Sequence, residues 1–176
     1  MKKEELIDLI ESWENFELVA IKISEEPKYL ELLFDIILNS NNPKRWRAAW
    51  IADKVNDKHP ELIAPFIEKI ITSLGPHIDF SSKRHLLKLI SLHTIPEEHY
   101  SSLLDYCLNT MVSSKEPVAI RVHAMQILYN ISEAIPEFKP ELLAIIRHEA
   151  EIHASPGFKA RGKKLSQQLH RQIRQS

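Results

Sequence analysis

Residues 43–62 read PKRWRAAWIADKVNDKHPEL, and this stretch decides the fold because parts of it return along the chain. Arg47 is followed by Arg84 and Arg121, each 37 residues after the one before. Each arginine lies near the start of a helical hydrophobic pattern that runs into a proline-marked turn. A period of this length predicts stacked helical hairpins, in which each repeat covers the apolar face of its neighbour.

Two further repeated sequence features support this period of 37 residues. Pro43 and Pro117 each lie four residues before an arginine of the series. The triplet Pro-Glu-Leu at 60–62 returns at 140–142. These prolines are expected at helix starts, because the first turn of a helix has no internal partner for the N–H that proline lacks.

The hydrophobic pattern predicts helices throughout. Apolar residues recur at intervals of three and four, as at Ile63, Phe66, Ile67 and Ile70, and sustained alternation at two is absent. The chain is therefore predicted to be all-α. Helices are expected over 3–13, 16–24, 27–39, 43–56, 60–73, 81–93, 96–112, 117–132, 138–152 and 156–173.

Capping residues mark several of the helix starts. Asn42 precedes Pro43 and Ser155 precedes Pro156, so a capping side chain stands just before a residue without an N–H. Residues 94–97, Thr-Ile-Pro-Glu, have the form of a capping box. We expect a helix to begin at each of these three places.

The expected helices pair into hairpins, and residues 1–176 are predicted to form a single domain. The pairs are 16–24 with 27–39, 43–56 with 60–73, 81–93 with 96–112, and 117–132 with 138–152. Helices 3–13 and 156–173 would cap the ends, because a terminal repeat has no neighbour to cover its apolar face. On the second helices, Leu104 and Ile146 are among the residues expected to be buried at related positions.

Two segments near the C-terminus carry a family resemblance. Ala-Met-Gln at 124–126 stands in the first helix of the last hairpin, and Phe-Lys-Ala-Arg at 158–161 opens the final helix. In these segments and in its repeat pattern the chain resembles HEAT-type and ARM-type repeats, and more closely the short bacterial HEAT-like proteins. The resemblance covers nearly the whole chain. It implies a right-handed α-α superhelix of about four irregular hairpins with capping helices, a class made mostly of binding surfaces.

The composition excludes several classes of site. With only three glycines, the chain has neither a glycine-rich phosphate loop nor a dinucleotide-binding fingerprint. The single cysteine, Cys107, cannot form an internal disulfide and lies in a sequence typical of the buried side of a helix. A chain of 176 residues can bury a core without a metal or a disulfide. No cofactor is expected.

The N-terminal sequence bears on location. Residues 1–5 lead directly into an acidic amphipathic pattern without the apolar core of a signal peptide. No apolar run approaches the roughly 18 residues that a membrane span needs. A cytoplasmic location is therefore expected, with no membrane partner.

Charge is distributed unevenly along the chain. Residues 1–151 carry 17 Lys/Arg and 24 Asp/Glu, a balance of −7, whereas residues 152–176 carry 6 Lys/Arg and no acid. The final helix is thus a basic appendage on an acidic body. Its cations suit contact with nucleic acid or an acidic partner, and they suit equally the C-terminal half of a capping helix or the acids of the body.

Trp46 and Trp50 lie four residues apart and share a helix face, with Arg47 and Asp53 adjoining it. Aromatic rings beside a basic group can hold bases or sugars, so these residues are candidates for ligand binding. Large residues at this spacing also pack between neighbouring hairpins, and packing is the interpretation that we favour.

The arginine series is the second candidate site. Arg47, Arg84 and Arg121 could form a ladder with a step of about 10 Å, suited to a phosphodiester or an acidic peptide. A ladder requires the three side chains to reach one open face without carboxylate partners. The alternative is a solvated or ion-pairing position between repeats, which contributes only about 0–1 kcal/mol per surface pair.

No metal site or catalytic site is visible. His148 and His153 are five residues apart, whereas the zincin helix motif needs histidines four apart to share a face. The other histidines are scattered without ligand spacing. No nucleophile has a visible base and orienting carboxylate, so the chain is expected not to be an enzyme.

These observations predict a non-enzymatic scaffold, a monomer or weak dimer, that binds a segment of a partner protein on a concave face lined by second helices. Acids on these helices favour a basic or amphipathic guest on charge grounds. They are Glu31, Asp35, Glu61, Glu68, Asp105, Glu141 and Glu149.

The alternative function is nucleic-acid binding or DNA repair. The architecture and the tryptophans beside arginines resemble the HEAT-like alkylpurine DNA glycosylases, which are longer and more basic. Nucleic acid is nevertheless disfavoured as a partner, because an acidic body repels a polyanion.

Overall fold

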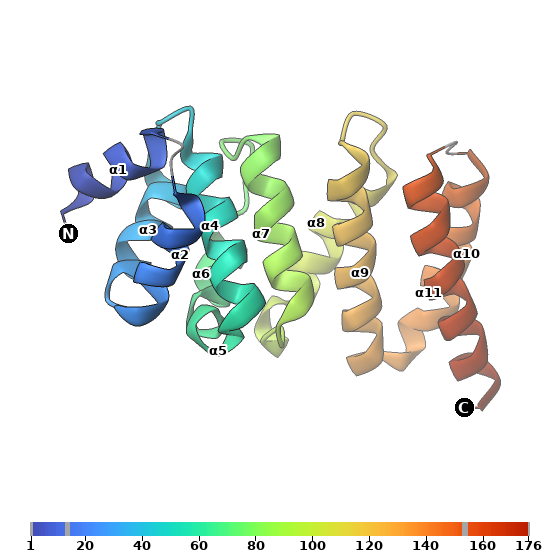
Figure 1. The fold of residues 1–176 in the computed structure, drawn as a ribbon. Helices are drawn as coiled ribbons and strands as arrows, with labels where there is room; N and C mark the ends of the chain where they lie inside the picture. The colour runs from blue at the N-terminus through green and yellow to red at the C-terminus, as the bar shows by residue number, and fades with distance from the viewer. Residues whose placement is uncertain (1, 13–14, 153–154, 176) are drawn as a thin grey trace. The chain divides into compact units, whose positions relative to one another are not determined.

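The structure is a computed structural model that describes residues 2–12, 15–152 and 155–175 (Figure 1). Within these ranges the regular elements are helices, and no strand is present. The predicted all-α fold class is therefore confirmed. None of the described helices is both long enough and apolar enough to cross a membrane.

The helices follow the predicted order, and most of their ends lie within one or two residues of the predicted ones. They are α1 (Lys3–Ser12), α2 (Phe16–Glu25), α3 (Tyr29–Asn39), α4 (Arg45–Lys58), α5 (Pro60–Ile63), α6 (Ile67–Ser73), α7 (Phe80–Leu92), α8 (Tyr100–Val112), α9 (Val118–Ala134), α10 (Lys139–Ile152) and α11 (Pro156–Gln175). Single 3-10 turns precede α6, α8 and α10; these are η1 (Ala64–Phe66), η2 (Glu97–His99) and η3 (Pro136–Phe138).

The helix predicted over 60–73 is interrupted. The 3-10 turn η1 separates α5 from α6, and Pro65 stands at its centre. Proline has no N–H to donate to the carbonyl four residues earlier, so a regular α-helix cannot continue through this position. The backbone tightens for one turn and then resumes as α6.

The predicted capping box at 94–97 does not form. Pro96 has an extended backbone, and the 3-10 turn that starts at Glu97 has no side-chain cap. A cap that the sequence analysis did not identify lies before α7, where Asp79 Oδ1 accepts a hydrogen bond from the backbone N–H of Ser82 at 2.9 Å. Before α4, Asn42 Oδ1 accepts the N–H of Lys44 at 2.8 Å, but the helix begins only at Arg45 and has no side-chain cap, so the predicted cap at Asn42 does not form.

The chain divides into two compact units, with the division after Thr94. In the first unit α2, α4 and α7 form one layer, and α3, α5 and α6 form a second (Figure 1). The central helix α4 packs against α2, α3 and α7, and its Ala48, Ala49 and Ala52 are fully buried, so the neighbouring helices can approach closely. In the second layer the rings of Phe34 and Phe66 stack with centroids 4.3 Å apart.

In the second unit, α9 packs against α8, α10 and α11. Ile146 is fully buried, as predicted. Leu104 was expected to be buried too, but it is only half-buried, and Leu103 is buried in its place. The expected register of α8 was therefore wrong by one residue, which turns a helix face by about 100°.

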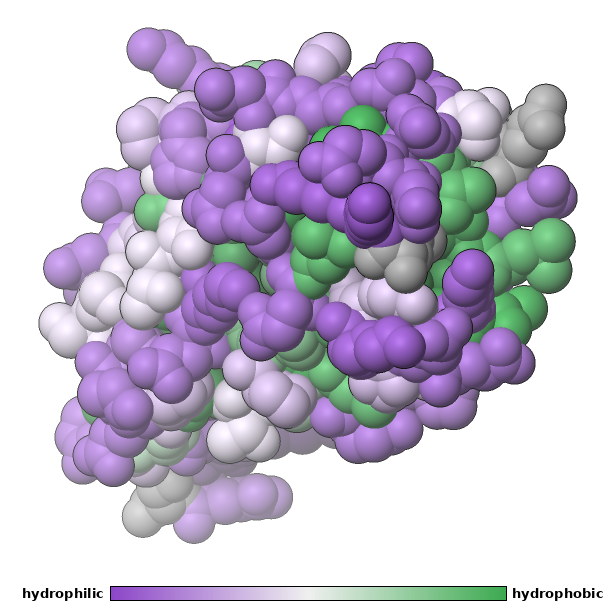
Figure 2. Space-filling model, turned by 90° about the vertical axis from the view of Figure 1, so that its left-hand side faces the viewer, coloured by the Kyte–Doolittle hydropathy of each residue, from purple (hydrophilic) through white to green (hydrophobic). Residues whose placement is uncertain are grey.

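Large apolar side chains also reach the surface of the first unit. The face drawn in Figure 2 shows hydrophobic patches between hydrophilic side chains. On α1 and α2 the exposed large apolar residues are Leu9, Leu18 and Ile21. Single exposed apolar residues are ordinary in proteins, so these residues alone do not define a site.

Candidate functional site

The two predicted tryptophans take part in packing at the surface of α4. Trp50 meets the ring of Phe16 on α2 edge to face, with centroids 5.3 Å apart, and Lys54 Nζ lies 5.4 Å from the Trp50 ring centroid. The guanidinium of Arg47 lies 5.5 Å from the Trp46 ring centroid. Both tryptophans are half-buried. They share a face beside Arg47, as predicted.

Arg47 ties α1 to α4. Its Nη1 donates to the backbone carbonyls of Ile10 at 3.1 Å and of Glu11 at 2.9 Å. Both carbonyls belong to the last turn of α1, where they have no partner within the helix and where the helix dipole favours a cation. Arg47 therefore caps the C-terminal end of another helix.

Arg121 has the same kind of contact in the second unit. Its Nε donates to the carbonyl of Met111 in the last turn of α8 at 2.7 Å, and its Nη2 pairs with Glu149 of α10 at 3.2 Å. Its guanidinium also lies 4.6 Å from the ring centroid of Phe158 on α11. Burial lowers the pKa of Arg121, and the negative charge of Glu149 partly offsets this. A ligand ladder would need Arg121 on an open face and without a carboxylate partner. Arg121 is instead buried and paired with Glu149.

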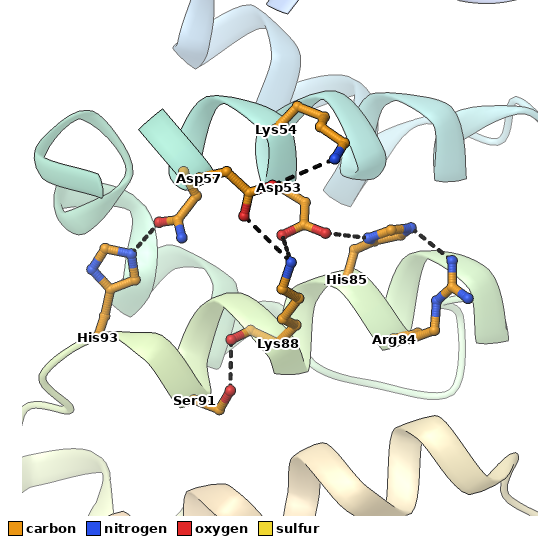
Figure 3. Close-up of polar contacts among 9 residues, drawn as sticks. Asp53, Lys54, Asp57, Arg84, His85, Lys88, Ser91 and His93 are labelled. Atoms are coloured by element: carbon orange, nitrogen blue, oxygen red, sulfur yellow. Dashed lines mark hydrogen bonds and ion pairs between the residues drawn. The ribbon is translucent and has the colours of Figure 1, made fainter. Parts of the chain in front are cut away.

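Arg84 belongs to a polar cluster between α4 and α7 (Figure 3). Arg84 is exposed, and its Nη2 lies 3.1 Å from Nε2 of His85. A guanidinium has no acceptor, so Nε2 must accept this hydrogen bond and the ring proton must lie on Nδ1. That proton is donated to Asp53 Oδ2, 3.0 Å away. The neighbours of His85 thus determine its tautomer.

Asp53 and Lys88 form the ionic part of this cluster. Lys88 Nζ lies 2.6 Å from Asp53 Oδ1 and 3.5 Å from Asp57 Oδ1. Burial raises the pKa of Asp53, but hydrogen bonds from His85 and Lys88 outweigh it and leave this pKa below its ordinary value. For Lys88, burial lowers the pKa, but the bond to Asp53 outweighs it and the pKa is raised. The pair is therefore held in its charged form.

This cluster contains the residue types of a catalytic site, but it is closed. The side chains of Asp53 and His85 are 8% and 6% exposed. Both ring nitrogens of His85 already have partners, so neither is available to take a proton from a substrate. The arrangement suits helix packing better than chemistry. The sequence places Asp53 beside the tryptophan face, but no local pattern connects it to His85, which lies 32 residues away.

The first unit has a groove between α2 and α4 with a volume of about 440 Å³. Ala20 and Ile21 contribute apolar surface from α2, and Lys54, Asp57 and Lys58 contribute charges of both signs from α4. The residues that line it include neither of the predicted tryptophans nor Arg47. Mixed charge leaves this groove without a clear preference for a cationic or an anionic ligand.

The second unit has a more apolar groove between α8 and α10, with a volume of about 490 Å³. Leu108 and Val112 line it from α8, and Ala144 and Ile145 line it from α10. Val112 is 43% exposed, which is high for a branched apolar side chain. This groove lies on the second helices of two successive hairpins.

The acids expected on the second helices differ in their surroundings. Glu149 lines the groove between α8 and α10, but it is mostly buried and paired with Arg121. Glu31 pairs with Lys69 at 2.9 Å. Asp105 and Glu141 are exposed, and each lies one turn before residues of the groove between α8 and α10. Of the histidine pair considered for metal binding, His148 is exposed and position 153 lies outside the described residues.

Comparison with known proteins identifies one family. A family profile described as HEAT repeat domain matches residues 3–169, which is nearly the whole chain. No curated protein and no solved structure matches the chain significantly.

Proposed function

The chain belongs to the HEAT repeat domain family, and on this basis we propose that it is a non-enzymatic scaffold that binds a segment of another protein. Helical-repeat proteins present extended surfaces made from equivalent helices of successive repeats, and such surfaces commonly bind other proteins. The groove between α8 and α10 is a surface of this kind, and it is the observation that carries the proposal.

The groove favours an amphipathic segment with a basic residue at one end. α8 and α10 are each joined to α9 by a short connection, so they run parallel to one another. Asp105 precedes the groove residues of α8, and Glu141 precedes those of α10, so both acids lie at the same end. An apolar stripe of the guest would contact Val112 and Ile145, and a Lys or Arg would lie near the two acids.

The proposal is tested by selecting twelve-residue peptides from a displayed library on the full chain and measuring their affinity by fluorescence anisotropy. We expect the selected peptides to combine an apolar stripe with Lys or Arg. The variant Val112→Asn should weaken them about tenfold, because an amide then replaces apolar surface in the contact.

Val118→Asn is the matched control. Val118 is 39% exposed at the start of α9 and does not line the groove, so the same substitution there should leave the affinity unchanged. Peptides that bind both variants equally, or that lack basic residues, would contradict the proposed groove.

A further inference from the structure

A second groove of the same unit lies on the opposite flank of α10, between α10 and α11, with a volume of about 320 Å³. Arg147 lines it from α10, and Lys159, Lys163 and His170 line it from α11. Arg147 and both lysines are exposed. Among the described residues that line the groove Glu151 is the one acid, so this groove is predominantly cationic, whereas acids flank the groove between α8 and α10.

Small residues bring the two helices together beneath these cations. A side-chain carbon added to Gly162 of α11 would lie 3.4 Å from Ile146 Cγ2 and 3.6 Å from Ala150 Cβ of α10. Gly162 and Ala150 both line the groove, so no large side chain rises from its floor. Arg147 of α10 lies on one side of this floor, and Lys159 and Lys163 of α11 lie on the other. The backbone of a bound chain could lie on the floor between them.

The spacing of the cations on α11 suits an extended peptide. Lys159 and Lys163 are four residues apart, which is about 6 Å along a helix. In an extended chain, side chains on one side are two residues apart, which is about 6.6–6.8 Å. A carboxylate at every second position could therefore pair with successive cations of the row.

We propose that the groove between α10 and α11 binds an extended acidic segment of a partner protein, with Asp or Glu at alternate positions. This inference goes beyond the proposed function, because it concerns a second surface with the opposite charge preference. Ser166 and Gln167 also line the groove and provide polar groups for the backbone of the guest.

An acidic peptide fits this groove better than a nucleic acid does. Among the described residues that line the groove there is no Phe, Tyr or Trp on which a base could stack, and Phe158 of α11 is fully buried. Residues 1–151 carry a balance of −7, with 17 Lys/Arg and 24 Asp/Glu. This charge repels a long polyanion more than it repels a short segment held at α11.

The test uses a fluorescein-labelled twelve-residue peptide of alternating Glu and Ser, with anisotropy measured on the full chain in low salt. A peptide of alternating Gln and Ser controls for charge. We expect the acidic peptide to bind and the neutral one not to bind. The double variant Lys159→Gln/Lys163→Gln should weaken binding about five- to tenfold, because two partly exposed ion pairs are lost.

The double variant Lys164→Gln/Arg171→Gln removes the same charge from another face of α11, where both residues are exposed and neither lines the groove. It should weaken binding less than about twofold. Equal losses in the two double variants, no binding of the acidic peptide, or tighter binding of a twenty-nucleotide DNA strand would each overturn the inference. Val112→Asn should leave binding of this peptide unchanged, so a failure of the first groove is distinguished from a failure of the second.

Discussion

Arg121 connects four helices with one side chain, since it stands on α9 and contacts α8, α10 and α11. Replacing it with Met would leave the buried carboxylate of Glu149 without this partner. We expect Arg121→Met to lower the free energy of unfolding by about 3–5 kcal/mol, measured by urea denaturation.

The second variant in this test is Arg121→Met/Glu149→Leu. It removes both charges, so it should recover much of the stability lost in the single variant, because a buried apolar pair avoids the cost of an uncompensated charge. A single variant as stable as the wild type would show that the ion pair is not important for packing.

We expect His93 to make the stability of the fold depend on pH. Its Nε2 donates to Asn56 Oδ1 at 2.5 Å, and burial lowers its pKa below the ordinary value. The unfolded chain therefore binds the proton first as the pH falls below about 6.5. The stabilising contribution of neutral His93 should be fully present above that pH and should be lost as the pH falls through the lower, folded-state pKa.

We expect His93→Gln to make this part of the stability curve flatter, because Gln can donate the same hydrogen bond without titrating. Urea denaturation at several pH values between about 5 and 7.5 measures the slope. The non-titrating Val118→Asn variant, at an exposed position, is the control and should keep the wild-type slope. The same slope in His93→Gln would show that other groups cause the pH dependence.

The arginine series is visible in the sequence, but the groups that its members contact are not. Arg47 caps carbonyls 36 and 37 residues earlier, and Arg121 pairs with a carboxylate 28 residues later. Such partners become visible only when helices are packed, because backbone carbonyls at helix ends leave no sequence signal. The interpretation of Arg47, Arg84, Trp46 and Trp50 as ligand contacts remains a prediction, whereas the burial of Arg121 and its pairing with Glu149 argue against that role for Arg121.

At the scale of elements, α7 owes its start to Asp79. The carboxylate accepts the N–H and the hydroxyl of Ser82 at 2.9 and 2.7 Å, and it pairs with Arg45 Nε at 2.9 Å. Asp79→Ala should lower the free energy of unfolding by about 1–2 kcal/mol and speed amide hydrogen exchange in the first turn of α7. Asp79→Asn keeps a capping oxygen and should cost less. Equal costs for the two variants would contradict a capping role.

The helices themselves were largely predictable, because the three–four apolar spacing and the prolines act locally. What could not be predicted arises from competition between local signals. Pro65 lies inside a helical pattern, where its missing N–H makes a 3-10 turn. Leu103 and Leu104 are adjacent, so the local sequence does not show which of them faces the core. In the structure Leu103 is the buried one. The grooves were missed for a related reason, since small residues such as Ala150 give no binding signal in sequence.

At the scale of the whole molecule, the question is whether the two compact units unfold together. The tryptophans at 13, 46 and 50 all precede the division after Thr94, so tryptophan fluorescence reports on the first unit alone. Circular dichroism at 222 nm reports on helices of both units. We propose that residues 1–176 form a single domain and expect the two urea transitions to coincide, because neighbouring repeats stabilise one another. Two separate midpoints would instead indicate two independent folding units.

The cations of α11 also affect how the protein adsorbs to an ion-exchange resin. The formal net charge is −1, which by itself suggests retention on an anion exchanger. Adsorption depends on the patch that touches the resin, and Lys159, Lys163, Lys164, Arg171 and Arg174 are all exposed on this one helix. The protein should therefore bind a cation-exchange column at pH 7 in low salt despite its negative net charge. Immobilised in that way, the protein would contact the support through α11.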